Sequence, residues 1–134
     1  MNDIAAALGI VQLEKLSEMN YRRKVLLEQY VDGLKNINDI DLLMPYEPNK
    51  YVYWMFGVRS DFRDDLMIYL KSKGVATGCH YTPLHMQPLF KQFNSDCPVA
   101  EFEYSRFMTL PFHAALKVEE VDYVIQVLTE YNKT

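Results

Sequence analysis

Hydrophobic positions at helical spacing dominate the first quarter of the chain. From Asp3 to about Gly33 their recurrence favours one long helix, or two joined end to end, over a strand. The stripe comprises Ile4, Leu8, Val11, Leu16, Val25 and Leu34. Asn2 or Asp3 can cap the start, and Gly33 can end the helix. About 30 residues would span roughly 45 Å, which is longer than a domain of this size is wide, so part of the helix is expected to contact something other than the chain's own core.

The clearest strand signal lies at residues 51–59. Both alternating sets of side chains are apolar there, so both faces of the strand are expected to be covered. A helix should follow, capped by Ser60 or Asp61 and ended by Gly74, which can adopt a left-handed conformation. A further strand is expected at 75–81. This order of strand, helix and strand permits a parallel crossover, although the sheet as a whole can be mixed.

The rest of the chain alternates short elements with irregular connections. The expected elements are a short edge strand at 42–44, one helical turn around 86–90, a helix at 98–107, a strand at 108–110 and a helix at 119–131. Lys117 stands where the last helix would prefer Ser, Thr or Asp as its cap. The pattern predicts one α/β (α+β) domain over residues 1–134. It consists of a connecting helix at 1–34 and a small unit at 35–134, whose mixed or antiparallel sheet has helices packed on one face.

The amino-acid composition narrows the class of protein. The 134 residues are 49% hydrophobic and 24% charged, which is typical of a globular protein, and a net charge of −4 with scattered Lys and Arg argues against a nucleic-acid partner. No apolar run is long enough for a membrane span, no signal-peptide pattern is seen, and Cys79 and Cys97 have dissimilar surroundings, so a cytoplasmic protein with free thiols is expected. Ten Tyr, seven Phe and one Trp are many for this length and indicate a surface that a partner covers.

Side chains that could carry chemistry concentrate in residues 73–85, KGVATGCHYTPLH. A strand that ends at His80 and Tyr81, followed by a turn that leads to His85, would bring polar groups to one end of the sheet, where loops commonly carry function. No metal site is expected, because ligand-pair spacings are missing and neighbours on a strand, such as Cys79 and His80, point to opposite faces. Neither cysteine has a visible source of thiolate activation, and no glycine-rich phosphate loop is present. The residues alone identify no reaction.

Many short motifs nevertheless occur in order along nearly the whole chain. They are Asn2-Asp3-Ile4, Ala6-Ala7, Gly9, Gln12-Leu13, Arg22-Arg23, Tyr30, Tyr53, Arg59, Leu70, Gly74-Val75, His80-Tyr81, Leu84-His85, Pro88, Pro98-Val99-Ala100-Glu101, Leu110-Pro111 and Val121-Asp122-Tyr123-Val124. Together they resemble the C-terminal part of the sugar-nucleotide aminotransferases of the DegT/DnrJ/EryC1/StrS family. The resemblance implies the fold type I architecture of pyridoxal phosphate (PLP) enzymes. In that fold a large domain carries the cofactor and its Schiff-base lysine, and a small C-terminal domain closes over the active site of a homodimer.

By this resemblance the chain corresponds to the small domain and the helix that leads into it, and the PLP-binding large domain is absent. No lysine here has a context that matches the Schiff-base lysine, so no catalytic residue and no bound cofactor are expected in this chain alone. The resemblance places His80, Tyr81 and His85 at the mouth of the active site, where they would contact a nucleotide-linked sugar. The alternative is that His80 and Tyr81 only anchor the loop. The segment before Leu84 is shorter than is usual in the family, so the substrate side can be reshaped.

Two functions from different classes follow. The first is the C-terminal domain of a PLP-dependent aminotransferase that acts on nucleotide-linked keto sugars, as in amino-sugar and cell-surface polysaccharide biosynthesis, and that is inactive alone. The second is a free-standing, non-catalytic binding or oligomerisation module that kept the fold. Either would depend on a partner. A homo-oligomer is therefore expected, with Asn2, Asp3, Ile4, Leu8 and Trp54 at the contact.

Overall fold

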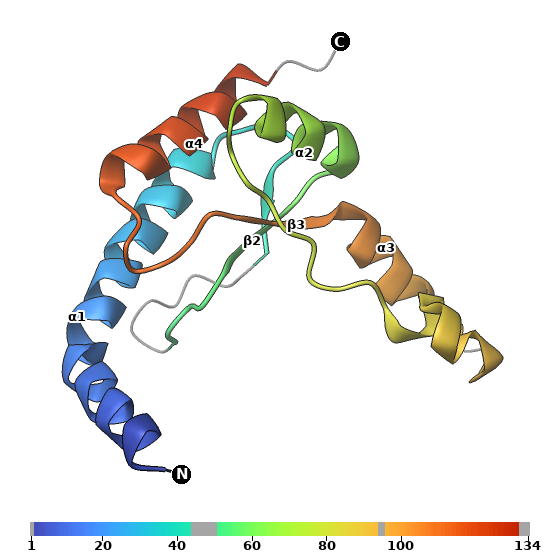
Figure 1. Ribbon diagram of the computed structural model, residues 1–134. Helices are drawn as coiled ribbons and strands as arrows, with labels where there is room; N and C mark the ends of the chain where they lie inside the picture. Colours follow the sequence, from blue (N-terminus) through green and yellow to red (C-terminus); the bar gives the residue numbers. More distant parts are fainter. Residues whose placement is uncertain (1, 44–50, 94–95, 132–134) are drawn as a thin grey trace.

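The computed structural model describes residues 2–43, 51–93 and 96–131. Its helices are α1 (Asp3–Leu34), α2 (Arg63–Ser72), α3 (Pro98–Arg106) and α4 (Val118–Glu130). Its strands are β1 (Asp41–Leu42), β2 (Phe56–Arg59) and β3 (Phe107–Leu110), and two 3-10 helices are η1 (Leu84–Met86) and η2 (Pro88–Phe93). Helices α1 and α4 lie side by side, whereas α3 projects on the other side of the strands (Figure 1).

Helix α1 is continuous, so the first of the two predicted alternatives, one long helix, is correct. The side-chain oxygen of Asn2 accepts a hydrogen bond from the backbone N–H of Ala5 at 2.9 Å, so Asn2 is the N-cap. The helix ends at Leu34, one residue beyond the possible stop at Gly33. Gly33 instead packs against α4, since a Cβ at this position would come within 2.5 Å of the Ile125 side chain. The missing side chain lets the two helices approach closely.

The sheet has the order β1-β2-β3, and both neighbouring pairs are antiparallel. Along β2 and β3 the pairing begins with Phe56 opposite Leu110. After α2 the chain returns to the other edge of β3, where Gly78 forms an isolated antiparallel bridge with Thr109. The segment at Gly78 therefore runs parallel to β2, with β3 between them.

The two long strand predictions are wrong in extent. The apolar run at 51–59 pairs only over Phe56–Arg59, and the run at 75–81 pairs only at Gly78. The two runs are parallel to each other, as the sequence permits, but they do not pair directly because β3 lies between them. The described sheet is therefore antiparallel, which is one of the two predicted sheet types.

The other elements lie within a few residues of their predicted positions. Strand β1 is the expected edge strand, although Met44 falls outside the described residues. Gly74, just after α2, has a φ of 77°, which is the predicted left-handed conformation. The N-cap of α2 is Phe62, so the prediction of Ser60 or Asp61 is wrong by one or two positions. The Ser60 hydroxyl still accepts the Phe62 backbone N–H at 3.2 Å.

The start of α4 lacks a side-chain cap, as the sequence at Lys117 predicted. Glu120 compensates in part, because its carboxylate accepts the backbone N–H of Lys117 at 2.7 Å. Gln29 of α1 also donates from its side-chain amide to the Val118 carbonyl at 2.9 Å and to the Asp122 carboxylate at 2.5 Å. These bonds fix the start of α4 against α1.

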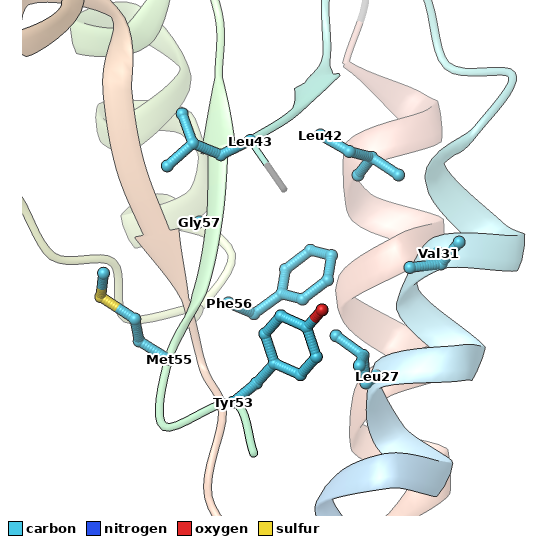
Figure 2. A pocket seen from close by; sticks show the side chains of 8 residues that line it. All are labelled: Leu27, Val31, Leu42, Leu43, Tyr53, Met55, Phe56 and Gly57. Carbon is cyan, nitrogen blue, oxygen red and sulfur yellow. The ribbon is translucent and has the colours of Figure 1, made fainter. Parts of the chain in front are cut away.

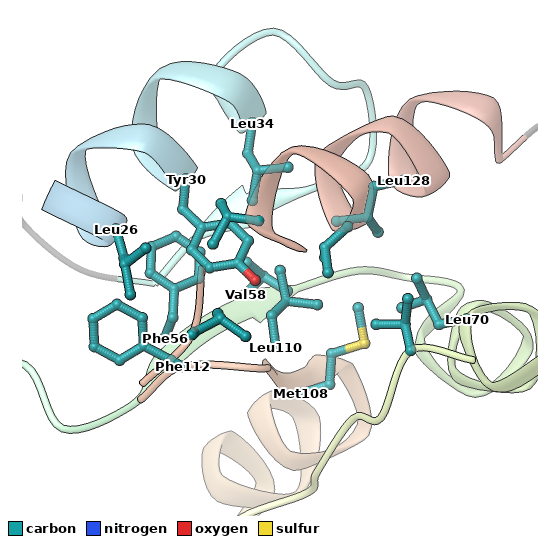
Figure 3. Packing of buried hydrophobic residues seen from close by; sticks show 14 of the residues in the cluster. Leu26, Tyr30, Leu34, Phe56, Val58, Leu70, Met108, Leu110, Phe112 and Leu128 are labelled. Atoms are coloured by element: carbon teal, nitrogen blue, oxygen red, sulfur yellow. The ribbon is translucent and has the colours of Figure 1, made fainter. Parts of the chain in front are cut away.

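The core lies between one face of the sheet and the helices α1, α2 and α4 (Figure 3). Phe56 and Leu110, which are opposite each other on β2 and β3, both face it. Tyr30 of α1 is fully buried, stacks on Phe56 with ring centroids 4.6 Å apart, and donates its hydroxyl to the Pro111 carbonyl at 2.9 Å. Burial raises the pKa of the Tyr30 phenol above its ordinary value.

Candidate functional site

The loop at residues 79–86 leaves the sheet beside β3 and carries the predicted site residues. His80 is half-buried, and its ring covers Gly78, where a Cβ would come within 2.6 Å of Nε2. The absence of a side chain at Gly78 therefore makes room for the imidazole. Tyr81 is 73% exposed, and its ring meets the His80 ring edge to face with centroids 5.0 Å apart. His80 and Tyr81 thus form one aromatic pair at the end of the sheet.

His85, the third predicted site residue, is turned towards α3. Its Nε2 lies 2.8 Å from the Glu101 carboxylate, and its side chain is only 14% exposed. Thr82 makes a parallel contact, with its hydroxyl 2.9 Å from the Tyr104 hydroxyl. Glu101 and Tyr104 are three positions apart and so share one face of α3. The loop is therefore fastened to α3 at two points.

A buried arginine lies next to these contacts between the loop and α3. Arg63 of α2 is 9% exposed, and its Nη1 donates to the carbonyls of Tyr104 at 3.0 Å and Phe107 at 3.3 Å. The guanidinium also lies 5.3 Å from the centroid of the Tyr104 ring, a cation–π distance. Nη1 is 3.0 Å from Sγ of Cys79. The sequence did not predict that a guanidinium lies beside Cys79.

Charged side chains hold the rest of α3 in place, because none of its residues is buried. Glu103 pairs with Arg59 of β2 at 3.2 Å. Arg106 pairs with Asp61 and, at 3.3 Å, with Asp41. Partly exposed pairs of this kind each contribute little to stability. The position of α3 therefore depends on several weak ion pairs together with Arg63.

An apolar groove of about 310 Å³ runs along β2 and the residues before it. It is lined by Leu43, Tyr51, Val52, Tyr53, Trp54, Met55 and Gly57. Trp54 is 65% exposed, and its ring lies at an angle to the His80 ring with centroids 6.5 Å apart. The groove and the aromatic pair of the loop therefore adjoin each other.

A second cavity lies between β2 and α1 and is too small for a ligand. In Figure 2 the rings of Tyr53 and Phe56 approach Leu27 of α1, whereas Met55 points away on the other side of the strand. The enclosed space is about 20 Å³, which is room for roughly one water molecule. Because its walls are apolar, it represents imperfect packing of the core.

The predicted interface residues lie on the surface of the chain. Ile4 is 75% exposed, Leu8 63% and Trp54 65%. Asn2 and Asp3 are also exposed, and Asn2 is already engaged as the N-cap. Exposed apolar side chains that cluster are typical of surfaces that a partner covers. Their contact with another copy of the chain stays a prediction.

Three residues that shape the loop were not found from the sequence, namely Arg63, Glu101 and Tyr104. One signal was available, since two polar residues three apart in the loop, Thr82 and His85, match two residues three apart in the helix. That match could not be used from the sequence alone, because the residues meet only when α3 packs against the loop in the opposite chain direction. Arg63 carried no signal of its own, because an arginine in a first helical turn is normally solvated.

The described lysines do not form a site for PLP. A Schiff-base lysine must be held in a pocket against the cofactor. Lys24 is half-buried, and the other described lysines are exposed on helices or loops. Lys35, for example, pairs with Asp32 on the surface of α1, and Lys73 lies over the Tyr69 ring. These side chains do not fit the cofactor.

Metal ligands do not cluster in the described part of the chain. Residues 2–43, 51–93 and 96–131 contain no group of three His, Cys, Asp or Glu side chains able to hold a metal ion. Cys79 and Cys97 are both free thiols. Among the helices described, none is both long enough and apolar enough to cross a membrane.

Solved structures with the same arrangement are aminotransferases. The aminotransferase TlmJ from Streptoalloteichus hindustanus is 31% identical with a TM-score of 0.88, over 96% of this chain and 36% of its own length. DesV from S. venezuelae, solved with a ketimine intermediate, is 26% identical with a TM-score of 0.84, over 93% of this chain and 35% of DesV. Helicobacter pylori PseC, an aminotransferase in pseudoaminic acid biosynthesis, is 25% identical with a TM-score of 0.87, over 96% of this chain and 36% of PseC.

These solved structures are aminotransferases of the fold type I PLP family, and the chain shares their fold. It belongs to the DegT/DnrJ/EryC1/StrS aminotransferase family, which it matches over residues 1–129. The chain spans about a third of the length of the solved relatives, since it covers 36% of TlmJ and 35% of DesV. The family resemblance drawn from the sequence is confirmed.

Proposed function

We propose that this chain is the C-terminal region of a PLP-dependent aminotransferase that acts on nucleotide-linked keto sugars in amino-sugar or cell-surface polysaccharide biosynthesis. In this role it closes the active site and binds substrate, and it has no activity alone. The cofactor and the Schiff-base lysine come from the rest of the enzyme, which works as a cytoplasmic homodimer. The observation that carries the proposal is the aromatic pair of half-buried His80 and exposed Tyr81, presented beside an apolar groove by a chain of this family.

The loop offers the groups that a sugar nucleotide needs. The ring of Tyr81 is exposed, so its hydroxyl can exchange hydrogen bonds with sugar hydroxyls or phosphate oxygens. Nδ1 of His80 is buried and lacks a hydrogen-bond partner among the described residues, and a buried polar atom of this kind calls for a partner. His85 uses Nε2 for Glu101, which leaves Nδ1 as the atom that would meet substrate.

Substrate binding is tested by titrating the isotope-labelled chain with a nucleotide-linked keto sugar and following amide and histidine resonances by NMR. Shifts should be confined to the loop and the adjoining groove. Tyr81→Phe, which removes one hydrogen bond of about 1–1.5 kcal/mol, should weaken binding roughly tenfold. His113→Asn is a control, because His113 is exposed elsewhere and its replacement should leave binding unchanged. Shifts spread evenly over the surface, or none in the loop, would refute the substrate role.

The cofactor part of the proposal needs a separate measurement. The purified chain is mixed with PLP, reduced with borohydride and digested, and the lysines that carry the cofactor are identified by mass spectrometry. We expect low, scattered modification of exposed lysines and no transamination of a keto sugar with glutamate. Stoichiometric labelling of a single lysine would contradict the proposal, because that lysine would then be a Schiff-base former within this chain.

The second candidate is a free-standing binding or oligomerisation module that kept the fold. The exposed apolar side chains of α1 and the groove at Trp54 favour it as much as they favour the first. The two differ in the loop, because a module that only self-associates has no need of a sugar nucleotide. Self-association without any response of His80 and Tyr81 to the sugar nucleotide would favour the module.

A further inference from the structure

The loop at 79–86 has little backbone support of its own. The last ladder contact before it is the Gly78–Thr109 bridge, where each residue donates to the other at 3.1 and 2.8 Å. Within the described residues, the backbone of 79–82 makes no hydrogen bond to another element. Support returns only with the short helix η1, where Met86 donates to the Pro83 carbonyl at 2.9 Å. Side chains must therefore set the path of the loop.

Two residues of α3 supply that support in a matched arrangement. The loop residues Thr82 and His85 are three positions apart, and so are their partners Tyr104 and Glu101. Thr82 meets the later helix residue and His85 the earlier one, so loop and helix run in opposite directions. One turn of α3 thus contacts the segment after Tyr81 at two points.

Tyr104 is itself held from within the domain. Arg63 donates to its carbonyl at 3.0 Å and lies 5.3 Å from its ring, and Arg63 is 9% exposed. Arg63 therefore holds Tyr104 in place, and the Tyr104 hydroxyl contacts Thr82. Glu101 is anchored less firmly, because its side chain is 49% exposed.

We propose that Tyr104 and Glu101 are positioning residues, which act through Thr82 and His85 to hold the loop that presents His80 and Tyr81. Tyr104 sets the path of the loop just after Tyr81, and Glu101 sets it at η1. The proposal rests on the proposed function for the claim that this loop meets a sugar nucleotide. The mechanical part, that α3 orders the loop, does not depend on that function.

The test measures loop order in the whole 134-residue chain by ¹⁵N relaxation. Tyr104→Phe removes the hydroxyl and keeps the ring over Arg63, so the fold should survive. Backbone order parameters at 79–82 should fall from about 0.85, typical of rigid backbone, to below about 0.6. Glu101→Ala should lower the order parameters nearer His85 by a smaller amount. Trp54, the single tryptophan, reports the same change independently, because its fluorescence should shift as His80 moves.

Three further variants separate positioning from general loss of structure. Thr82→Val is nearly isosteric and should reproduce the effect of Tyr104→Phe, and the double variant should be no worse than either alone. Ser105→Ala is the control on the same helix, because that hydroxyl bonds only to the Phe102 carbonyl within α3. Its order parameters and its Trp54 emission should match the wild type.

The outcomes distinguish the two proposals. Unchanged order parameters and unchanged emission in Tyr104→Phe and Glu101→Ala would overturn the positioning role, whatever the chain binds. If the loop loosens in the variants but the wild-type chain does not respond to the sugar nucleotide, α3 supports the loop and the substrate role is refuted. A loop that loosens and then binds the sugar nucleotide several-fold more weakly would support both. Additive effects of Thr82→Val and Tyr104→Phe would mean that the two hydroxyls act separately, which contradicts the proposal.

Discussion

The two halves of α1 have the same helical geometry and opposite surroundings. From Leu26 to Leu34 the apolar side chains are buried against β2 and α4, and Tyr30 and Leu34 are fully enclosed. From Ile4 to Leu16 equally apolar side chains are 42–75% exposed, with Ile4 and Leu13 among the most exposed. Helix propensity and capping are satisfied in both halves, so local structure does not account for the difference.

The two halves of α1 also differ in how their apolar residues are distributed around the helix. In the C-terminal half, burial extends along one stripe, as expected for a helix that packs on a single core. In the N-terminal half, Leu8 and Leu13 point to different sides of the helix, so apolar residues surround it. A helix that is apolar all round is normally enclosed by more than one neighbour. The exposed half is therefore suited to an environment that this chain does not itself provide.

The largest expected effect comes from truncating the buried half. Leu34→Ala should lower the free energy of unfolding by about 2–5 kcal/mol, because a fully enclosed side chain leaves a cavity. Leu13→Ala makes the same chemical change at a position that is 70% exposed and should alter stability by less than about 0.5 kcal/mol. Urea denaturation followed by circular dichroism measures both variants. Equal losses would show that the N-terminal half of α1 is also covered within the chain, which would contradict the difference between the two halves.

A moderate effect is expected at Tyr30, within the buried half. Tyr30→Phe removes the hydroxyl that donates to Pro111 and should cost about 1–2 kcal/mol near neutral pH. Burial raises the pKa of this phenol in the folded state, so the unfolded chain loses the proton first as the pH rises above the ordinary tyrosine value near 10. The stabilisation from Tyr30 is therefore complete below about pH 9 and is lost above about pH 10, at up to roughly 1.4 kcal/mol per pH unit.

The control for this change is Tyr21→Phe on the exposed side of the same helix, where the side chain is 68% exposed. Stability curves at several pH values between 7 and 11 compare each variant with the wild type. The difference between the wild type and Tyr30→Phe should shrink as the pH rises, and that for Tyr21→Phe should stay near zero throughout. A Tyr30 difference that is constant with pH would mean that the phenol does not titrate differently in the two states.

The same contrast explains how much of the fold could be predicted. Helical periodicity located α1, α2 and α4, and the left-handed Gly74 was found because only one residue type favours that conformation. The strand at 51–59 was overestimated, because β-branched and aromatic residues favour strands in general, whereas the length of pairing depends on the partner. Strand β3 has only four residues, so β2 has no more than four to pair with.

The candidate site divides in the same way. His80, Tyr81 and His85 were predicted because polar residues after an apolar run are expected at the end of a sheet, and they lie close together in the sequence. Glu101 and Tyr104 could not be found, because they reach the loop only through the docking of α3. That docking depends on ion pairs and on Arg63, contacts between segments distant in sequence that leave no periodic pattern. The family resemblance was informative where the physical signals were weak, since it uses the order of many small motifs.

The smallest effect on stability, and the most informative about the exposed half, is expected from introducing charge there. The paired change Ile4→Lys and Leu8→Lys keeps good helix formers and should change the free energy of unfolding of the monomer by less than about 0.5 kcal/mol. If these residues form the predicted contact between copies, the oligomer should dissociate, because two ammonium groups would be buried in an apolar interface. Sedimentation velocity of the wild type and the variant over a range of concentrations measures this directly.

The control must share the added charge without touching the apolar surface. Glu14→Lys raises the net charge by two, as the paired change does, at an exposed polar position of the same helix, and its sedimentation should match the wild type. If it too dissociates, net charge rather than the apolar surface governs association. A wild-type chain that is monomeric at every concentration would remove self-association by this chain.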